Sequence, residues 1–229
     1  KLLVETNRLE EAEQLVLEAV AVQKRVFSEP HSDVMGGLSA AARVLAARGK
    51  NAEAEARTRE ALALGRVLYA GDSTALAMTT ANLAGYVQAQ NRIDEAADLH
   101  RAALRLYVLG TGAKDAGTAI VMTNLAYNAY LRRSLVEADS LYRQALAVLD
   151  SAWRGNPQIT QTLLDFSQVL VDRGNCAEAD AYLRRVIAFK LQDTPPRYAP
   201  DTRARRTLGN CLVQTGRLAE AEPLLLTAY

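Results

Sequence analysis

Two stretches, "NRLEEAEQLVLEAV" at Asn7–Val20 and "NRIDEAADLHRAAL" at Asn91–Leu104, open on the same dipeptide and carry Glu-Ala at the same offset. The same Glu-Ala pair recurs along the whole chain at intervals of 41 or 42 residues. Its alanines are Ala12, Ala54, Ala96, Ala138, Ala179 and Ala221. A fixed period of this length is typical of a repeat protein, in which each unit is one supersecondary element.

The residues that follow each alanine have a helical spacing. A larger residue stands four positions after the alanine and a smaller one seven positions after it. Both offsets fall on one face of an α-helix, which we call helix B. The larger residues are Val16, Thr58, His100, Tyr142, Leu183 and Leu225, and the smaller ones are Ala19, Ala61, Ala103, Ala145, Val186 and Ala228.

A second helical pattern, helix A, precedes helix B in each unit. It is formed by Leu38, Ala41, Ala42 and Leu45, and it returns at Met122, Leu125, Ala126 and Ala129 and at Leu163, Phe166, Ser167 and Leu170. In a further unit, Thr80 takes the first apolar place before Leu83, Ala84 and Val87. Because no alternating pattern competes with these helices, we expect an all-α chain of helical hairpins.

The segment between helix A and helix B requires a turn. Glycine or asparagine occupies one slot there, at Asn7, Gly49, Asn91, Gly174 and Gly216, as expected for a residue in the left-handed conformation. Arg133 takes this slot in one unit, so we expect that turn to be built differently. Ser134 with Glu137 and Asn175 with Glu178 have the spacing of capping boxes. We interpret Glu53 and Glu55 as solvated residues at a helix start.

The repeated pattern is a large residue, then Leu-Gly/Ala, then a large apolar residue, and then Ala-x3-aromatic-x2-Ala. This order of residue types resembles the tetratricopeptide repeat. The period here exceeds the usual length of about 34 residues by roughly two helical turns. The pattern is similar to the longer variant found in kinesin light chains and in bacterial multidomain proteins. We expect Pro223 to lie in the first turn of the last helix B. The resemblance covers the chain and implies a right-handed superhelical solenoid of antiparallel helix hairpins. Its expected units span 1–34, 35–76, 77–118, 119–159, 160–201 and 202–229, the first and last being partial.

The composition narrows the function classes. The chain has 229 residues and a formal net charge of +1, so no positive excess favours binding to nucleic acid. No apolar run approaches the roughly 20 residues that a membrane span needs. We expect a cytoplasmic protein in which Cys176 and Cys211 stay reduced. The chain begins at Lys1, and we interpret it as a fragment whose two open ends could self-associate end to end.

Residues for catalysis are scarce in the sequence. His100 occupies a helix B slot filled by Tyr142 and Leu183 elsewhere, so we expect a packed core residue. His31 lies in a segment between units, and we interpret it as a helix-start residue. No phosphate loop, zinc spacing or nucleophile motif is present, so we expect no enzyme activity, no cofactor and no metal. Trp153 is interpreted as covering a helix end.

The resemblance implies a partner-binding groove lined by helix A. Carried over to this sequence, the lining comprises Arg43, Asn82, Asn124, Tyr127, Tyr130, Asp165, Gln168, Arg206 and Asn210. Asn82 and Asn124 share one phase with Asp165 and Thr207, which suggests a ladder of short polar side chains that could hold a peptide backbone. The alternative is that these residues only solvate an inner face. Arg203 and Arg206 are the nearest equivalents of the basic clamp found in chaperone-binding members.

Three functions remain open at this point. The first is a non-catalytic scaffold that binds a peptide or a partner protein in the groove. The second is a regulatory or sensor region of a larger bacterial enzyme, because the Ala/Arg-rich sequence resembles arrays that follow serine/threonine kinase domains. The third is a structural array that assembles through its ends. The Asn-Arg dipeptides at Asn7 and Asn91 are turn residues in all three, and no ligand site is expected there.

Overall fold

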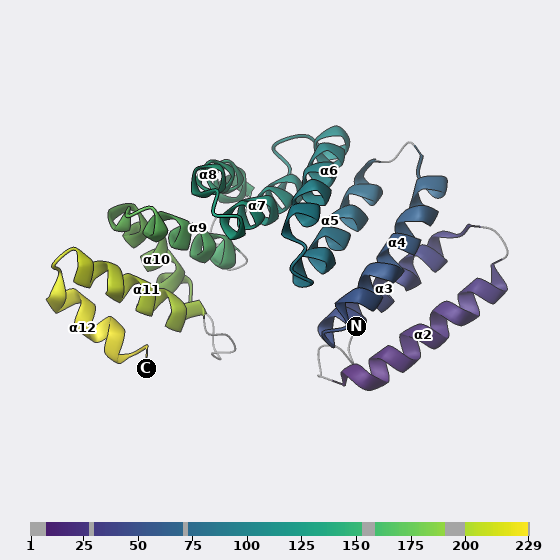
Figure 1. The fold of residues 1–229 in the computed structure, drawn as a ribbon, viewed down its shortest axis with the longest axis horizontal. Helices are drawn as coiled ribbons and strands as arrows, with labels where there is room; N and C mark the ends of the chain where they lie inside the picture. The colour runs from purple at the N-terminus through teal and green to yellow at the C-terminus, as the bar shows by residue number, and fades with distance from the viewer. Residues whose placement is uncertain (1–7, 28–29, 71–72, 153–158, 191–199, 229) are drawn as a thin grey trace. The chain divides into compact units, whose positions relative to one another are not determined.

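A computed structural model describes residues 8–27, 30–70, 73–152, 159–190 and 200–228, and these residues form eleven α-helices. The expectation of an all-α chain is confirmed (Figure 1). The helices are α2 (Leu9–Val26), α3 (Ser32–Ala47), α4 (Asn51–Leu68), α5 (Ser73–Ala89), α6 (Ile93–Thr111), α7 (Ala116–Leu131), α8 (Leu135–Ala152), α9 (Thr160–Asp172), α10 (Cys176–Lys190), α11 (Pro200–Gln214) and α12 (Leu218–Leu226). The expectations for Asn7 and Trp153 lie outside the described residues.

The chain divides into two compact units, Lys1–Val121 and Met122–Tyr229. The division falls within α7, and each unit is described by itself. In unit 1, each helix from α2 to α6 contacts the next. In unit 2, α8 to α12 contact in the same sequential way, and α11 also contacts α9. These are the sequential helix hairpins that the sequence predicts, whereas the boundaries of the individual repeats and the handedness of a superhelix stay predictions.

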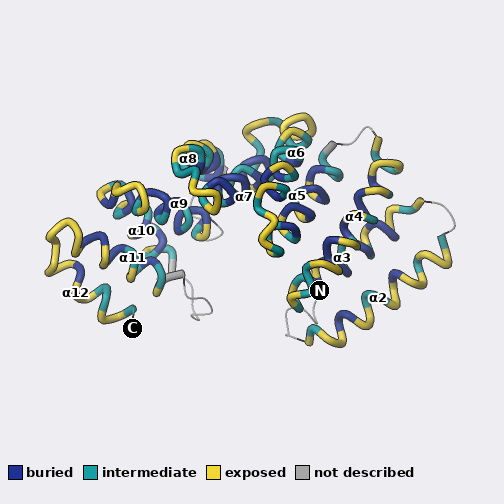
Figure 2. Tube along the Cα trace, in the orientation of Figure 1, coloured by how far each residue is buried: buried dark blue, intermediate teal, exposed yellow. Residues whose placement is uncertain are grey.

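The helix faces predicted to be apolar form the core of unit 1. Leu38, Ala41 and Ala61 pack with Val20 and Met35 in one cluster. A second cluster joins α4, α5 and α6, and a third lies around Leu45. Figure 2 shows the consequence in unit 1, where buried residues alternate with exposed ones along the helices. This is the arrangement expected when amphipathic hairpins stack on one another.

Unit 2 has a larger aromatic component in its core. Tyr142 of α8 and Phe166 of α9 are both fully buried, with ring centroids 5.7 Å apart. Tyr182 of α10 meets Phe166 edge-on at 5.1 Å. At the end of the unit, a Cβ on Gly209 would lie 2.6 Å from Leu225 of α12. The glycine therefore lets α11 and α12 approach closely, as the small residue of the repeat pattern requires.

The repeat register is confirmed by burial. All six alanines of the Glu-Ala pairs are at most 7% exposed. The larger residues Thr58, His100, Tyr142 and Leu183 are buried as well. One expectation is wrong, because Ala19 is exposed on α2. Its counterparts Ala61, Ala103 and Ala145 are fully buried, each within a hairpin of the interior.

The turns between helix A and helix B share one conformation. Gly49, Gly174 and Gly216 have φ values of 78°, 77° and 77°, and Asn91 and Arg133 both have φ of 62°. The expectation of a different turn at Arg133 is therefore wrong. The amide of Ser134 donates to the carbonyl of Ala129 at 2.9 Å, and at the glycine turn Lys50 donates likewise to Leu45 at 2.9 Å. This bond satisfies a carbonyl at the helix end, and it outweighs the cost of a left-handed arginine.

Two local expectations need correction at the C-terminal end. Cys176 and Cys211 form a disulfide between α10 and α11, with their Cα atoms 5.3 Å apart, so the expectation of reduced thiols is wrong. Neighbouring hairpins bring the two residues together although 35 positions separate them. Pro223 lies in the second turn of α12 and not in its first. The expected capping box is present in part, since Glu178 donates its amide to the side-chain oxygen of Asn175 at 3.3 Å.

Candidate functional site

In unit 1 the predicted groove residues are Arg43 on α3 and Asn82 on α5, and both are exposed. Burial raises the pKa of Tyr86 on α5, and the positive charge of Arg43 opposes this shift. The arginine therefore lies near the tyrosine of the neighbouring hairpin. Asn124, predicted to continue the ladder from Asn82, belongs to unit 2, so the ladder stays a prediction.

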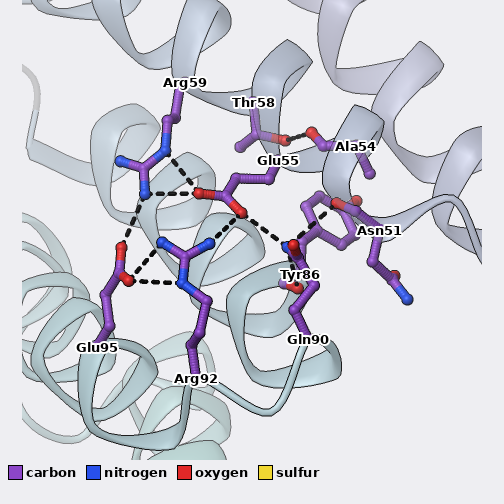
Figure 3. A network of polar contacts seen from close by, with 9 residues as sticks. All are labelled: Asn51, Ala54, Glu55, Thr58, Arg59, Tyr86, Gln90, Arg92 and Glu95. Atoms are coloured by element: carbon purple, nitrogen blue, oxygen red, sulfur yellow. Dashed lines mark hydrogen bonds and ion pairs between the residues drawn. The ribbon is translucent and has the colours of Figure 1, made fainter.

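The most concentrated polar cluster of unit 1 surrounds Glu55, as Figure 3 shows. Its carboxylate accepts hydrogen bonds from Arg59 (2.8 Å), from Gln90 (2.7 Å) and from Arg92 (2.7 Å). Arg59 also donates to Glu95 at 2.8 Å. Glu55 is only 8% exposed, so its interpretation as a solvated helix-start residue is wrong. Glu53, by contrast, has a side chain that is 59% exposed.

The electrostatics of Glu55 indicate a structural role. Burial by itself would raise the pKa of this carboxyl, but hydrogen bonds from Arg59, Gln90 and Arg92 outweigh it and lower the pKa. A carboxylate held charged, with both oxygens occupied, is a poor general base. It joins α4 to the turn between α5 and α6, and we call this arrangement the carboxylate clamp.

The carboxylate clamp recurs at the same place in the repeat. An acidic residue directly follows the alanine of the Glu-Ala pair. Its carboxylate bonds an arginine or a lysine that lies in the turn between the next two helices, or at the end of the helix just before that turn. Glu13 accepts from Arg48 (2.6 Å) and Lys50 (2.7 Å), and Asp180 accepts from Arg217 (2.7 Å). Asp139 pairs with Arg173 at 2.6 Å. This acid and this cation are visible as a periodic pattern in the sequence, which is the signal that could have predicted the clamp.

His100 is a buried residue of α6, as the sequence predicts. It is 1% exposed, and its Nδ1 atom has no hydrogen-bond partner in the described part of the chain. Burial lowers the pKa of His100 to about 4. The imidazole is therefore neutral at pH 7 and belongs to the core. His31 caps α3, since its Nδ1 accepts from the amide of Asp33 at 3.2 Å.

Four of the predicted groove residues come together in unit 2. On α7, the rings of Tyr127 and Tyr130 stack with centroids 6.3 Å apart. Burial raises the pKa of Tyr130, and a hydrogen bond with Asp172 at the end of α9 raises it further. Gln168 donates to the same carboxylate at 2.7 Å. The stacked tyrosines of α7 are thereby linked to the polar face of α9.

Asp165 is the central acid of this surface. Its side chain is 13% exposed, and its carboxylate accepts from Gln161 at 2.8 Å and from Arg203 of α11 at 3.3 Å. Burial raises the pKa of Asp165, and the two donors only partly offset this effect. Arg203, suggested by sequence as part of a basic clamp, is therefore an ion-pair partner of Asp165.

The hydroxyl of Tyr142 is the feature that the sequence did not reveal. It is buried and has no hydrogen-bond partner among the described residues. Burial raises the pKa of Tyr142, and Asp165, Tyr127 and Tyr130 are near enough to add to the shift. The periodicity identifies Tyr142 as a packing residue, and nothing in it shows that the polar end lies beneath this surface.

The remaining predicted residues lie on the same helices. Asn124 is half-buried on α7, and its carbonyl accepts from the side-chain amide of Asn128 at 3.2 Å. Arg206 and Asn210 are exposed on α11. Among the described residues, no group of three or more His, Cys, Asp or Glu side chains is placed to hold a metal ion. None of the helices described is both long and apolar enough to cross a bilayer.

Comparison with known proteins identifies the repeat. Residues 33–107 and residues 1–33 match two family models, each described as a tetratricopeptide repeat. No curated protein sequence matches the chain.

Several solved structures are similar in fold. BtubC (BKLC) from P. vanneervenii has a TM-score of 0.82 at 20% identity, over 96% of this chain and 89% of that one. A putative kinesin light chain from Podospora anserina, with nearly identical TPR-like repeats, has a TM-score of 0.71 at 18% identity, over 86% and 94%. PilF from Pseudomonas aeruginosa has a TM-score of 0.63 at 16% identity, over 83% and 72%. Residues 1–107 therefore match tetratricopeptide repeat models, and the solved structures show that the chain shares the fold of TPR-like repeat proteins.

Proposed function

We propose that this chain is a non-catalytic scaffold that binds an extended peptide segment of a partner protein on the α7–α9–α11 face of unit 2. Tetratricopeptide repeat domains are generally protein-interaction modules, which supports a protein partner. The observation that carries the proposal is the meeting of Tyr127, Tyr130, Asp165 and Gln168 in one region of unit 2, where two stacked rings lie beside two polar side chains.

The chemistry of this face suits a peptide. The carboxylate of Asp165 can accept a backbone N–H, and the half-buried amide of Asn124 can both donate and accept. The rings of Tyr127 and Tyr130 offer apolar area with little loss of side-chain freedom on binding. Arg206 and Asn210, which are exposed on α11, would extend recognition within unit 2. Should the chain instead be a regulatory part of a larger enzyme, such as a protein kinase, the same face would bind another segment of that enzyme.

A display selection tests this proposal even though the partner is unidentified. Random peptides would be selected on the purified wild-type chain, and the dissociation constant of each recovered peptide measured by fluorescence anisotropy. We expect Asp165→Asn and Tyr127→Ala each to weaken binding about tenfold, roughly 1.4 kcal/mol. The double substitution Asn82→Ala with Asn124→Ala measures the contribution of the expected ladder.

Gln144→Ala provides the matched control, because Gln144 is exposed on α8 and its amide bonds only within that helix. This variant should bind as the wild type does. Equal affinity for the Asp165, Tyr127 and Gln144 variants, with circular dichroism unchanged, would remove the proposed site. Recovery of no binding peptide would count against a peptide-binding scaffold.

A further inference from the structure

The disulfide Cys176–Cys211 lies at a place where it can be reached from solvent. The two residues are 7% and 2% exposed, yet both line a pocket of about 180 Å³ on the surface of unit 2. Ala177, Asp180 and Arg217 complete much of its wall. Buried structural cysteines are inert because nothing reaches them, whereas this pair lines a surface pocket large enough for a small thiol.

The surroundings of Cys176 favour a thiolate. Cys176 is the first residue of α10, a helix of 15 residues, and a helix N-terminus stabilises negative charge. Arg217 lines the same pocket, and its guanidinium group bonds Asp180. The side-chain amide of Gln214 is 3.4 Å from the Cys176 Sγ atom, and rotation of that amide would present its N–H group to a thiolate. These features make Cys176 the better leaving group of the pair.

The disulfide joins α10 to α11, and α11 packs against α12, a helix with little buried surface. In α12 the buried residue is Ala221, and the rest of the helix is exposed or half-buried. The α11–α12 hairpin is held to α10 by the packing of α11 against α10, by the disulfide, by the Asp180–Arg217 clamp and by Arg184 with Glu220. Because α12 has so few buried residues, we expect the hairpin to open locally more often once the covalent link is removed.

We propose that Cys176–Cys211 is a reversible redox site that locks the α11–α12 hairpin to α10. A thiolate of a dithiol reductant attacks the Cys211 Sγ atom, and the Cys176 Sγ atom leaves as a thiolate and takes up a proton. The second thiol of the reductant then attacks the reductant's other sulfur, which is bonded to the Cys211 Sγ atom in the mixed disulfide. The Cys211 Sγ atom leaves as a thiolate and takes up a proton. Two protein thiols form, and the dithiol is oxidised to a cyclic disulfide.

Native-state reduction followed by hydrogen exchange tests this site. The oxidised chain would be treated with dithiothreitol in native buffer, and the free thiols alkylated and counted by mass spectrometry. We expect both cysteines to be labelled while circular dichroism shows a folded chain, and amides of α11 and α12 to exchange at least about tenfold faster than before. Exchange in α9 should change little. Cys176→Ala with Cys211→Ala should show the faster exchange without reductant.

Two substitutions of alanine by leucine test whether the reductant enters through the pocket. Ala177→Leu adds volume to the wall and should slow reduction, whereas Ala188→Leu, at an exposed site of α10 outside the pocket wall, should not. The proposal is overturned if the disulfide is reduced only as fast as the whole chain unfolds. It is also overturned if exchange in α11 and α12 is unchanged after reduction, or if Ala177→Leu is reduced as fast as the wild type.

Discussion

The two units solve the same packing problem in different ways. Each must hold a helix B to the hairpin that follows it, and each places an acid directly after the repeat alanine for this purpose. In unit 1, Glu55 bonds Arg92 and Gln90, and in unit 2, Asp180 bonds Arg217. Unit 2 adds the disulfide Cys176–Cys211 next to its clamp.

The positions of the two cysteines are filled differently in unit 1. By the repeat register they correspond to Asn51 and Tyr86, and the amide of Gln90 lies 3.5 Å from the Asn51 carbonyl. Figure 3 shows these residues beside the Glu55 clamp. One junction thus has polar contacts and apolar packing but no covalent bond, whereas its counterpart has a disulfide as well. We therefore expect unit 1 to respond to loss of charge and unit 2 to oxidation state.

The largest effect should come from a feature that both units share. Ala138→Arg places a long charged side chain at a fully buried helix crossing, and we expect a loss of about 4 kcal/mol or more of the free energy of unfolding. Urea denaturation measures it. Ala147→Arg, at an exposed site of the same helix, should cost little. A melt of Ala138→Arg that matches wild type would contradict the repeat register.

Removal of the disulfide should affect unit 2 selectively. Cys176→Ala with Cys211→Ala lifts a restraint across 35 positions, and the chain-entropy model gives a loss of about 4 kcal/mol. Hydrogen exchange resolves where the loss falls. Faster exchange should appear in α11 and α12, while α3 and α4 keep their protection. Equal acceleration in both units would show that the two junctions are not independent.

Acid should destabilise the chain through His100 of unit 1. Its pKa is about 4 when folded and near 6.5 in an unfolded chain, so between these values the unfolded state binds more protons. The contribution is fully present above pH 6.5 and is lost as the pH falls toward 4, by about 2 to 3 kcal/mol. His100→Leu, which copies Leu183 of unit 2, should flatten this part of the stability profile. An unchanged slope would refute the role of His100.

Neutralising the clamp of unit 1 should have the smallest effect. Glu55→Gln removes the charge that holds Arg59 and Arg92, although both arginines keep Glu95 as a partner. We expect a loss of about 1 to 2 kcal/mol by urea denaturation at pH 7. Glu53→Gln is the matched control, because Glu53 is mostly exposed, and it should be near neutral. Equal losses of the free energy of unfolding for the two variants would show that Glu55 stabilises the chain no more than the exposed Glu53 does.

Much of this fold could be predicted because the repeat restates each packing position several times. The register of Ala54 and Ala138 fixes which helix faces are buried, and the structure confirms it. The register could not show which side chains of successive hairpins bond to one another. Glu55 has the pattern of a solvated residue because its partners Gln90 and Arg92 lie one hairpin later. The disulfide is hidden in the sequence for the same reason.

The candidate site shows the same limit. Helix phase places Tyr127, Tyr130, Asp165 and Gln168 on one side of their helices, and the structure brings these four residues into one region of unit 2. Helical spacing identifies Tyr142 as a packing residue but does not show where its hydroxyl lies. It therefore does not predict that this hydroxyl has no partner among the described residues. The prediction for the turn at Arg133 is wrong because propensity ranks arginine low, whereas the hydrogen bond from Ser134 fixes its conformation.

We propose that the α7–α9–α11 face binds a partner, whereas the carboxylate clamps are structural. Backbone amide chemical shifts, measured as a selected peptide is titrated into the isotope-labelled chain, distinguish the two roles. We expect the largest changes around Tyr127, Tyr130 and Asp165, with little change around Glu55 and Glu53. Changes centred on the exposed faces of α8 and α10, with α7 and α9 unaffected, would contradict it.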